Sequence, residues 1–261
     1  MEFNTISFKK ADQVSVIKFN RPKAFNAVNF DLFSDIIKAL EICADDGDVK
    51  VIVITGEGKA FCAGGDVALF DDSPDTGETL RQLTKLLNFA ITGIRRMPKP
   101  VIAMINGATA GVGVSIAAAC DLRICASSAQ FKQAYTSIGL IPDGAWTLLV
   151  PLLIGFNKAS ELVYLDPVFN AKEALEMGLV NKVVDYSELE KTTMDIALKL
   201  AQGPTLSYSI VKENFNNALL SLLERQLELE RRGLIWIGKT ADAKEGIAAF
   251  IGKRKPSFKG Q

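Results

Sequence analysis

Two glycine-rich stretches contain the residues whose types and spacing are best suited to chemistry. The first, Gly56–Asp66, follows the apolar run Val51–Thr55, and the second, Asn106–Gly113, follows the apolar run Val101–Ile105. A strand, a glycine turn and a helix N-terminus together leave free backbone N–H groups above the turn. Such groups suit an anion, or a carbonyl oxygen that becomes anionic during reaction. Glycines that only permit tight packing of a strand against a helix would give the same pattern.

A dinucleotide-binding loop is the obvious alternative for the second stretch. Its glycines, Gly107, Gly111 and Gly113, do not have the G-x-G-x-x-G spacing of that loop. Asp121 also follows too soon after the turn to be the acidic residue that holds a ribose. We therefore favour a site for an anion or a carbonyl oxygen over a dinucleotide site.

The chain contains no histidine, which restricts the possible chemistry. Ser-His-Asp and Cys-His mechanisms and the common catalytic zinc sites are excluded. Acid–base chemistry is left to carboxylates, Tyr, Lys, Cys or water. The four cysteines lack zinc-binding spacing, so no metal is predicted, and free thiols are the default in a reducing, cytoplasmic setting.

Composition indicates an ordinary globular protein. The 261 residues are 48% hydrophobic and 23% charged, with 30 basic and 30 acidic side chains, so nothing favours nucleic acid as a partner. No apolar run is long enough to cross a membrane, and the N-terminus lacks the apolar core of a signal peptide. We expect neither a nucleic-acid nor a membrane partner.

The remaining pattern predicts strands and helices in the first two-thirds of the chain and helices in the last third. Ile6–Lys9 and Val14–Phe19 are predicted to form a hairpin, and Phe30–Asp45 carries an apolar helical stripe. Asp71–Gly77, acidic and containing Ser, Pro and Gly, is predicted to be a mobile loop. The other predictions are strands at Leu122–Ala126, Gln130–Lys132 and Val180–Val184, and helices at Glu78–Met97, Leu148–Val163, Ala171–Glu176, Leu189–Gln202 and Leu206 to about Phe250.

From about Val14 to Lys259 the sequence resembles the crotonase, or enoyl-CoA hydratase/isomerase, superfamily. Each matching motif is weak alone, but their joint order and spacing are specific. The motifs are Asn20–Ala27, Gly56–Asp66, Lys99–Ala103 with Asn106-Gly107, Cys120–Arg123, Ala129–Phe131, Ile138–Asp143, Lys244–Phe250 and Lys253–Phe258.

The resemblance implies an α/β fold, a crotonase-like spiral of ββα units with a helical C-terminal trimerisation region. Residues 1–200 would form the spiral core with the acyl-CoA site. Residues 201–261 would form the helical region, packed on the core or on an oligomer partner. The family usually assembles as homotrimers or dimers of trimers. The leucine-rich run Leu206–Phe250 agrees with this assembly, because it has more apolar surface than a thin terminal layer readily buries.

Family members bind an acyl-CoA thioester as substrate, with no separate cofactor, and two backbone N–H groups hold the thioester oxygen. By position these would belong to Ala63 and Val112, one in each glycine stretch. Two donors stabilise an enolate, so the α-proton of a thioester becomes removable near neutral pH. This agrees with the strand–glycine–helix pattern described above, which suits both stretches to a developing oxyanion.

Hydratases of the family use two glutamates to activate water, but this sequence has Ser115 and Tyr135 at those positions. The remaining acid nearby is Asp143, where some family isomerases, and similar-looking ring-processing members of phenylacetate breakdown, have their lone carboxylate. A single carboxylate fits a proton shuttle. A turn residue or helix N-cap is the structural alternative for Asp143, and a pocket wall is the alternative for Tyr135.

The leading functional prediction is thus an isomerase that shifts a double bond in an enoyl-CoA. The alternatives are an enoyl-CoA hydratase, a dehalogenase- or hydrolase-type enzyme with Asp143 as nucleophile, and a catalytically silent CoA-binding protein. The basic tail Lys253–Lys255 could contact CoA phosphates or simply be solvated. The predicted substrate-binding residues are Lys23, Ala24, Ala60, Gly64, Gly65, Asp66, Gly111, Tyr135 and Trp146.

Overall fold

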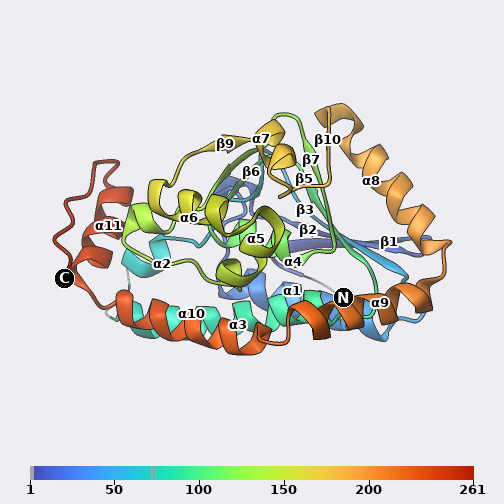
Figure 1. Cartoon of the computed structure of the whole chain (residues 1–261), viewed down its shortest axis with the longest axis horizontal. Coiled ribbons are helices and arrows are strands. Elements are labelled where there is room, and N and C mark those ends of the chain that lie inside the picture. The colour runs from blue at the N-terminus through green and yellow to red at the C-terminus, as the bar shows by residue number, and fades with distance from the viewer. Residues whose placement is uncertain (1–2, 72, 74) are drawn as a thin grey trace.

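The computed structural model describes residues 3–71, 73 and 75–261, and its larger sheet forms the centre of the molecule (Figure 1). The strand order is β1-β2-β3-β5-β7-β10. β1 and β2 form the predicted antiparallel hairpin, and all other neighbours are parallel. Every residue of β3 and β5 is buried, as is usual for parallel strands covered on both faces. The bounds are β1 Ile6–Ala11, β2 Val14–Phe19, β3 Val51–Gly56, β5 Val101–Ile105, β7 Leu122–Ala126 and β10 Lys182–Val184.

A second sheet has the order β4-β6-β8-β9 and is made of very short strands. β4, β6 and β8 are parallel, and β9 joins β8 antiparallel. Along the chain β3, β5 and β7 alternate with β4, β6 and β8, so each unit contributes one strand to each sheet before its helix. This order confirms the predicted spiral of ββα units. The bounds are β4 Ala60–Cys62, β6 Ala108–Ala110, β8 Gln130–Lys132 and β9 Phe169–Asn170.

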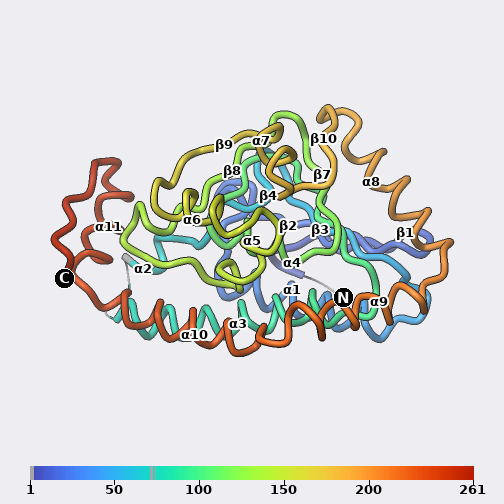
Figure 2. The backbone as a smooth tube through the Cα atoms, viewed as in Figure 1, coloured from blue at the N-terminus to red at the C-terminus, as the bar shows by residue number. Residues whose placement is uncertain are grey.

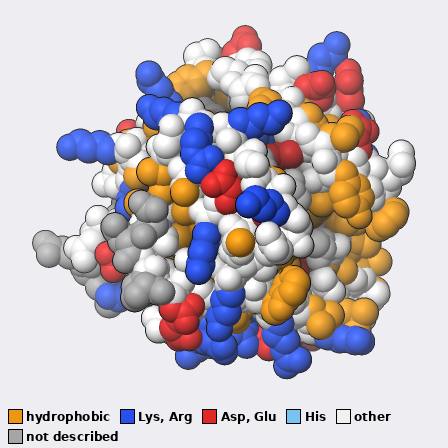
Figure 3. Space-filling model, turned by 90° about the vertical axis from the view of Figure 1, so that its left-hand side faces the viewer, with side chains coloured by type: hydrophobic (Ala, Val, Ile, Leu, Met, Phe, Trp, Pro, Cys, Tyr) orange, Lys and Arg blue, Asp and Glu red, His pale blue; other side chains and the backbone are white. Residues whose placement is uncertain are grey.

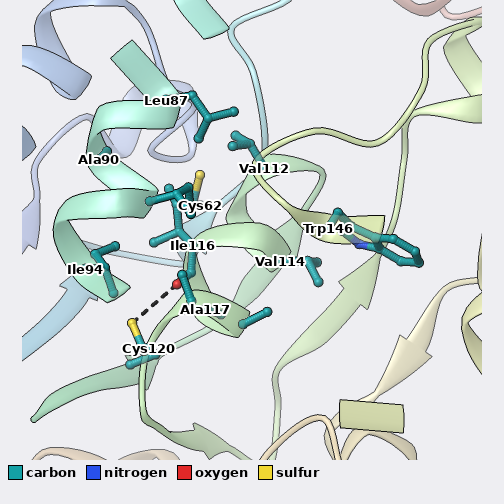
Figure 4. Packing of buried hydrophobic residues seen from close by; sticks show 14 of the residues in the cluster. Cys62, Leu87, Ala90, Ile94, Val112, Val114, Ile116, Ala117, Cys120 and Trp146 are labelled. Atoms are coloured by element: carbon teal, nitrogen blue, oxygen red, sulfur yellow. Dashed lines mark hydrogen bonds between the residues drawn. The ribbon is translucent and has the colours of Figure 1, made fainter. Parts of the chain in front are cut away.

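The helices cover the sheets and supply most of the core. α1 has the predicted bounds because Asn29 caps it, accepting the N–H of Leu32, and its apolar stripe is buried. Figure 4 shows Leu87 and Ala90 of α3 in the same apolar cluster as Ile116 of α4. The bounds are α1 Phe30–Asp45, α2 Ala68–Asp71, α3 Thr76–Arg96, α4 Val112–Ala119, α5 Trp146–Ile154, α6 Phe156–Leu165, α7 Ala171–Glu176, α8 Tyr186–Ala201, α9 Thr205–Leu219, α10 Leu223–Ile237 and α11 Ala241–Ile251, with short 3-10 turns η1 Pro22–Ala24 and η2 Thr136–Ile138.

The largest differences between the predicted and observed elements are at three places. The helix predicted at 148–163 is two helices, α5 and α6, because Gly155 between them has φ 79° and ψ 152°, outside the helical region. The long helix predicted from Leu206 is three helices, and Thr240 caps the last of them. In the loop predicted at 71–77, α3 already begins at Thr76, capped by Asp75; residues 72 and 74 lie outside the described chain.

The C-terminal region packs on the core of its own chain. α10 lies alongside α3 along one edge of the molecule, and Figure 2 shows the two backbones running together. α9 is held by a buried polar cluster, in which Lys212 donates to Asp121 Oδ2 at 2.7 Å and Arg95 donates to Asn216 Oδ1 at 2.6 Å and to Asp121 Oδ1 at 3.1 Å. These contacts anchor α9 and α10 to the core of the same chain. Within the described ranges, no helix is both long and apolar enough to cross a membrane.

Candidate active site

A cavity of about 680 Å³ lies where the loops after β4, β6 and β8 meet. Its size is in the range of small-molecule sites. These strands are parallel, so their carboxyl ends bring the three loops to one edge of the small sheet. Leu234 of α10 and Gly246 and Phe250 of α11 also line the cavity, so the C-terminal region closes it. The cavity thus unites both glycine stretches with the segment that carries Asp143.

Asp143 lies in the cavity wall with only 8% of its surface exposed. The Tyr135 hydroxyl donates to Asp143 Oδ1 at 2.6 Å, and the Ser115 hydroxyl donates to the backbone carbonyl of Asp143, also at 2.6 Å. Ser115 of α4 therefore holds the backbone of Asp143, while Tyr135 orients its carboxyl group. The two residues at the glutamate positions act on a third residue, the only carboxyl among the three.

The environment adjusts the acidity of this pair. Burial raises the pKa of Asp143 to about 6, although the hydrogen bond from Tyr135 lowers it. Burial and the neighbouring Asp143 charge raise the pKa of Tyr135 well above its usual range. The phenol consequently stays a hydrogen-bond donor to Asp143, while a carboxyl group with a pKa of about 6 is mostly ionised at neutral pH.

The structure does not support the prediction that Ala63 supplies one of the two oxyanion donors. The N–H of Ala63 already donates to the carbonyl of Phe25 at 3.1 Å. Gly65 forms an isolated parallel bridge with Val28, which uses the carbonyl of Gly64 and the N–H of Asp66. In such a bridge the N–H of Gly65 points to the opposite side, and within the described chain it has no acceptor. The loop sequence alone could not tell Ala63 from Gly65, because the acceptor that occupies the Ala63 N–H, the carbonyl of Phe25, lies in a different segment of the chain.

The second predicted donor, Val112, is the first residue of α4, where helical N–H groups have no partner within the helix. The backbones of the two glycine loops lie in close contact. A Cβ on Gly113 would lie 2.3 Å from the carbonyl oxygen of Cys62, and a Cβ on Gly111, whose φ is +52°, would lie 3.4 Å from Cα of Gly64. The glycines therefore permit tight packing of the two loops and also leave backbone donors near the cavity. The packing interpretation and the oxyanion interpretation of the glycine stretches are thus compatible.

The predicted substrate-binding residues fall into two groups. Those that line the cavity are Ala24, Gly64, Gly65, Asp66, Gly111 and Tyr135. Lys23, Ala60 and Trp146 do not line it. Trp146 is 1% exposed and packs in the core; Figure 4 shows its indole pointing away from Leu87 and Val112. Ala60 uses its carbonyl oxygen to accept hydrogen bonds from Asn26 and Asn106.

Sequence reasoning missed the residues that hold the loops in place. Asn26 is fully buried and donates to the carbonyls of Glu57 and Ala60, which explains the second asparagine of the Asn20–Ala27 motif. Arg21 donates to Asp66 Oδ2 at 2.8 Å and so ties that motif to the first glycine loop. Each of these partners lies more than thirty residues away along the chain. The only sequence signal for the contacts was the presence of a polar asparagine and arginine in the motif.

Two other kinds of chemistry find no support at this site. Burial raises the pKa of the Cys62 thiol to about 12, so this cysteine beside the glycine loop is not an activated nucleophile. Across residues 3–71, 73 and 75–261, no three His, Cys, Asp or Glu side chains are grouped as metal ligands. The groups that the cavity does offer are the Asp143 carboxyl group, the Asp66 carboxylate paired with Arg21, and backbone N–H groups of the two glycine loops.

Comparison with known proteins shows the family of the chain. The enoyl-CoA hydratase/isomerase family model matches residues 9–261. The chain is 34% identical to the 1,2-epoxyphenylacetyl-CoA isomerase of Escherichia coli K12 and 36% identical to a probable enoyl-CoA hydratase of Rhodobacter capsulatus, with 100% of both chains covered in each case. The crystal structure of an enoyl-CoA hydratase from Mycobacterium avium subsp. paratuberculosis superimposes with a TM-score of 0.91 at 32% identity, covering 99% of this chain and 100% of that one. With its two glycine loops, its ββα spiral and these relatives, the chain belongs to the enoyl-CoA hydratase/isomerase family.

Proposed function

We propose that the protein is an enoyl-CoA isomerase that shifts a double bond by a proton shuttle on Asp143. The observation that carries this proposal is the buried Asp143–Tyr135 pair in a cavity without a second free carboxylate. Among the described lining residues the only other carboxylate is Asp66, which is bound by Arg21. Ser115, which stands at one of the glutamate positions, donates its hydroxyl to the backbone carbonyl of Asp143. One base can move a proton between two carbons, whereas the family's hydration uses two carboxylates.

In the proposed reaction the thioester oxygen accepts the N–H groups of Gly65 and Val112. Ionised Asp143 removes a proton from the carbon beside the thioester, and the electron pair moves into an enolate whose oxygen the two donors stabilise. Asp143 then returns the same proton to the far end of the conjugated system, and the double bond moves. No atom is gained or lost. One such donor typically contributes about a hundredfold to a thousandfold in rate.

The cavity walls support an apolar acyl group. α3 contributes Leu80, Leu83 and Leu87, and Phe33 and Phe70 come from α1 and α2. The one hydroxyl that α3 adds to this wall, on Thr84, donates to the carbonyl of Leu80 at 2.6 Å and is therefore already satisfied. An aliphatic chain or a ring of carbon would be desolvated here without leaving a polar group unpaired.

The nucleotide end of CoA is proposed to meet the C-terminal tail. Arg254 lines the cavity and is paired with Glu245 at 2.6 Å, while Lys253 and Lys255 are exposed beside it. Figure 3 views the end of the molecule formed by α11 and the tail, where Lys and Arg side chains gather. Such cations can form charge-assisted contacts with phosphates.

We also propose a homotrimeric or dimer-of-trimers assembly. Large apolar side chains remain exposed on the described surface of α6, α9 and α10. Phe156 is 80%, Tyr164 83%, Leu206 84% and Trp236 70% exposed. An apolar surface of this kind favours contact with another protein surface, here other copies of the chain.

The test of the function is incubation with a panel of enoyl-CoA thioesters carrying the double bond at different positions, followed by mass spectrometry. Unchanged mass with a moved double bond supports isomerisation. A gain of the mass of one water would establish the hydratase, the activity in the name of the Rhodobacter capsulatus relative. Release of free CoA would indicate a hydrolase, and acyl-CoA binding without any product would indicate a silent CoA-binding protein.

A further inference from the structure

The turn that carries Asp143 runs directly into α5, and the start of this helix is capped from a distant part of the chain. Its N-cap residue is Ala145, whose side chain cannot accept a hydrogen bond. Glu230 of α10 supplies the acceptor instead. Glu230 Oε2 accepts the N–H of Ala145 at 2.6 Å, and Oε1 accepts the N–H of Thr147 at 2.9 Å together with the Thr147 hydroxyl.

The same turn is held in an unusual backbone conformation. Gly144 and Ala145 follow Asp143 with φ values of +69° and +61°, both in the left-handed region. A residue with a Cβ is strained there and stays only where its surroundings fix it. A Cβ on Gly144 would lie 2.9 Å from Cβ of Ser115, so α4 fixes one side of the turn. Glu230 fixes the other side.

Glu230 itself does not face the substrate. It is 4% exposed and is not among the residues that line the cavity. Both of its oxygens are used by the start of α5, where the helix dipole also favours a negative charge. Burial in this place raises the pKa of Glu230 to about 7, which shows how strongly the position desolvates the side chain.

We propose that Glu230 is a positioning residue for the reaction: it locks the left-handed turn Asp143–Ala145 and thereby aims the Asp143 carboxylate at the substrate. This inference rests on the proposed function, because it takes Asp143 as the base. It gives the C-terminal region a catalytic role in its own subunit. α10 both closes the cavity with Leu234 and sets the geometry of the base through Glu230.

The test is Glu230→Gln, with Glu228→Gln as the matched control. The amide oxygen can still accept from Thr147, but the amide NH₂ group would oppose the N–H of Ala145, and a donor facing a donor loosens the turn. We expect kcat for isomerisation, and the rate of proton exchange between substrate and heavy water, to fall about tenfold to a hundredfold. The dissociation constant of an unreactive saturated acyl-CoA should change less than about threefold. Glu228 lies on the same helix and pairs with Arg231 and Arg232 at the surface, so its variant should behave as the wild type.

An unchanged kcat in Glu230→Gln would overturn the inference while leaving the isomerase intact. Loss of acyl-CoA binding in step with kcat would also overturn it, since Glu230 would then only maintain the cavity. A wild type that neither isomerises nor exchanges protons would overturn both proposals. If Glu230→Gln does not fold, Ala145→Gly in the same chain relieves the left-handed strain. That double variant should fold and remain slow, and wild-type kcat in it would contradict the positioning role.

Discussion

At the scale of single residues, burial and the Tyr135 hydroxyl have opposite effects on the pKa of Asp143. Burial favours the neutral acid and raises the pKa of Asp143 to about 6, whereas the hydrogen bond from Tyr135 favours the carboxylate and lowers it. Because the base must be ionised to accept a proton, the rate should rise with pH through the pKa of Asp143. The pair therefore allows a base to be buried among apolar side chains and still act at neutral pH.

Tyr135→Phe removes the hydroxyl and keeps the ring. Without the hydrogen bond only the burial effect remains, so the apparent pKa of Asp143 should rise above about 6 and the rising limb of the pH–rate profile should move to higher pH. The measurement is kcat/KM of both proteins from acid to alkaline pH. An apparent pKa that falls, or an activity lost equally at every pH, would show that Tyr135 does not act through this bond.

At the scale of elements, glycines bring the C-terminal helix and the catalytic segment into backbone contact. A Cβ on Gly246 of α11 would lie 2.3 Å from the carbonyl oxygen of Ile138 in η2, the turn that begins after Tyr135. No flexible side chain can move aside there, because the facing atom is backbone. α11 thus supports the segment that orients Asp143.

Gly246→Ala should force α11 and η2 apart. Overpacking of this kind costs about 1–3 kcal/mol, so the variant should unfold at lower temperature and turn over more slowly. Gly47→Ala is the matched control, since a Cβ there would meet no atom within 4 Å. Thermal unfolding of the two variants checks the prediction, and equal stability would contradict the close contact seen between α11 and η2.

The elements that sequence predicted well are those with strong local signals. α1 matched to the residue because an asparagine cap precedes a clear apolar stripe. The small sheet was not predicted as such: β4, β6 and β9 are two or three residues long, and their pairing depends on partners far along the chain. The same holds for the site. Asp143 and Val112 could be located by motif, but the choice of Gly65 over Ala63 depends on a bridge to Val28, and Glu230 has no local signal at all.

At the scale of the whole molecule, the C-terminal region completes the active site of its own chain. The cluster of Arg95, Asp121 and Lys212 holds α9, and α10 and α11 then reach the cavity. About half of the leucine-rich run is buried in doing so: Leu223 and Leu227 are buried, while Leu222 and Leu229 remain 53% and 48% exposed. The exposed half is left for contacts outside the chain.

We therefore expect the protein to assemble in multiples of three at micromolar concentration. Sedimentation or light scattering gives the mass directly, and a trimer or hexamer is the expected result because the exposed apolar surface would otherwise stay in water. A monomeric mass under the same conditions would defeat this proposal. The isomerase proposal is tested separately, by the panel of enoyl-CoA thioesters.

The most direct test of the account is Asp143→Asn. The amide keeps the shape and can still accept the Tyr135 hydroxyl, but it cannot take up a proton. We predict that kcat for double-bond migration falls by about a hundredfold to ten-thousandfold, with acyl-CoA affinity nearly unchanged because the proposed thioester contacts of Gly65 and Val112 are kept. A fall in kcat with binding intact marks a group needed in the transition state. Full activity in Asp143→Asn, or activity lost instead through Tyr135→Phe at every pH, would contradict the assignment of Asp143 as the base.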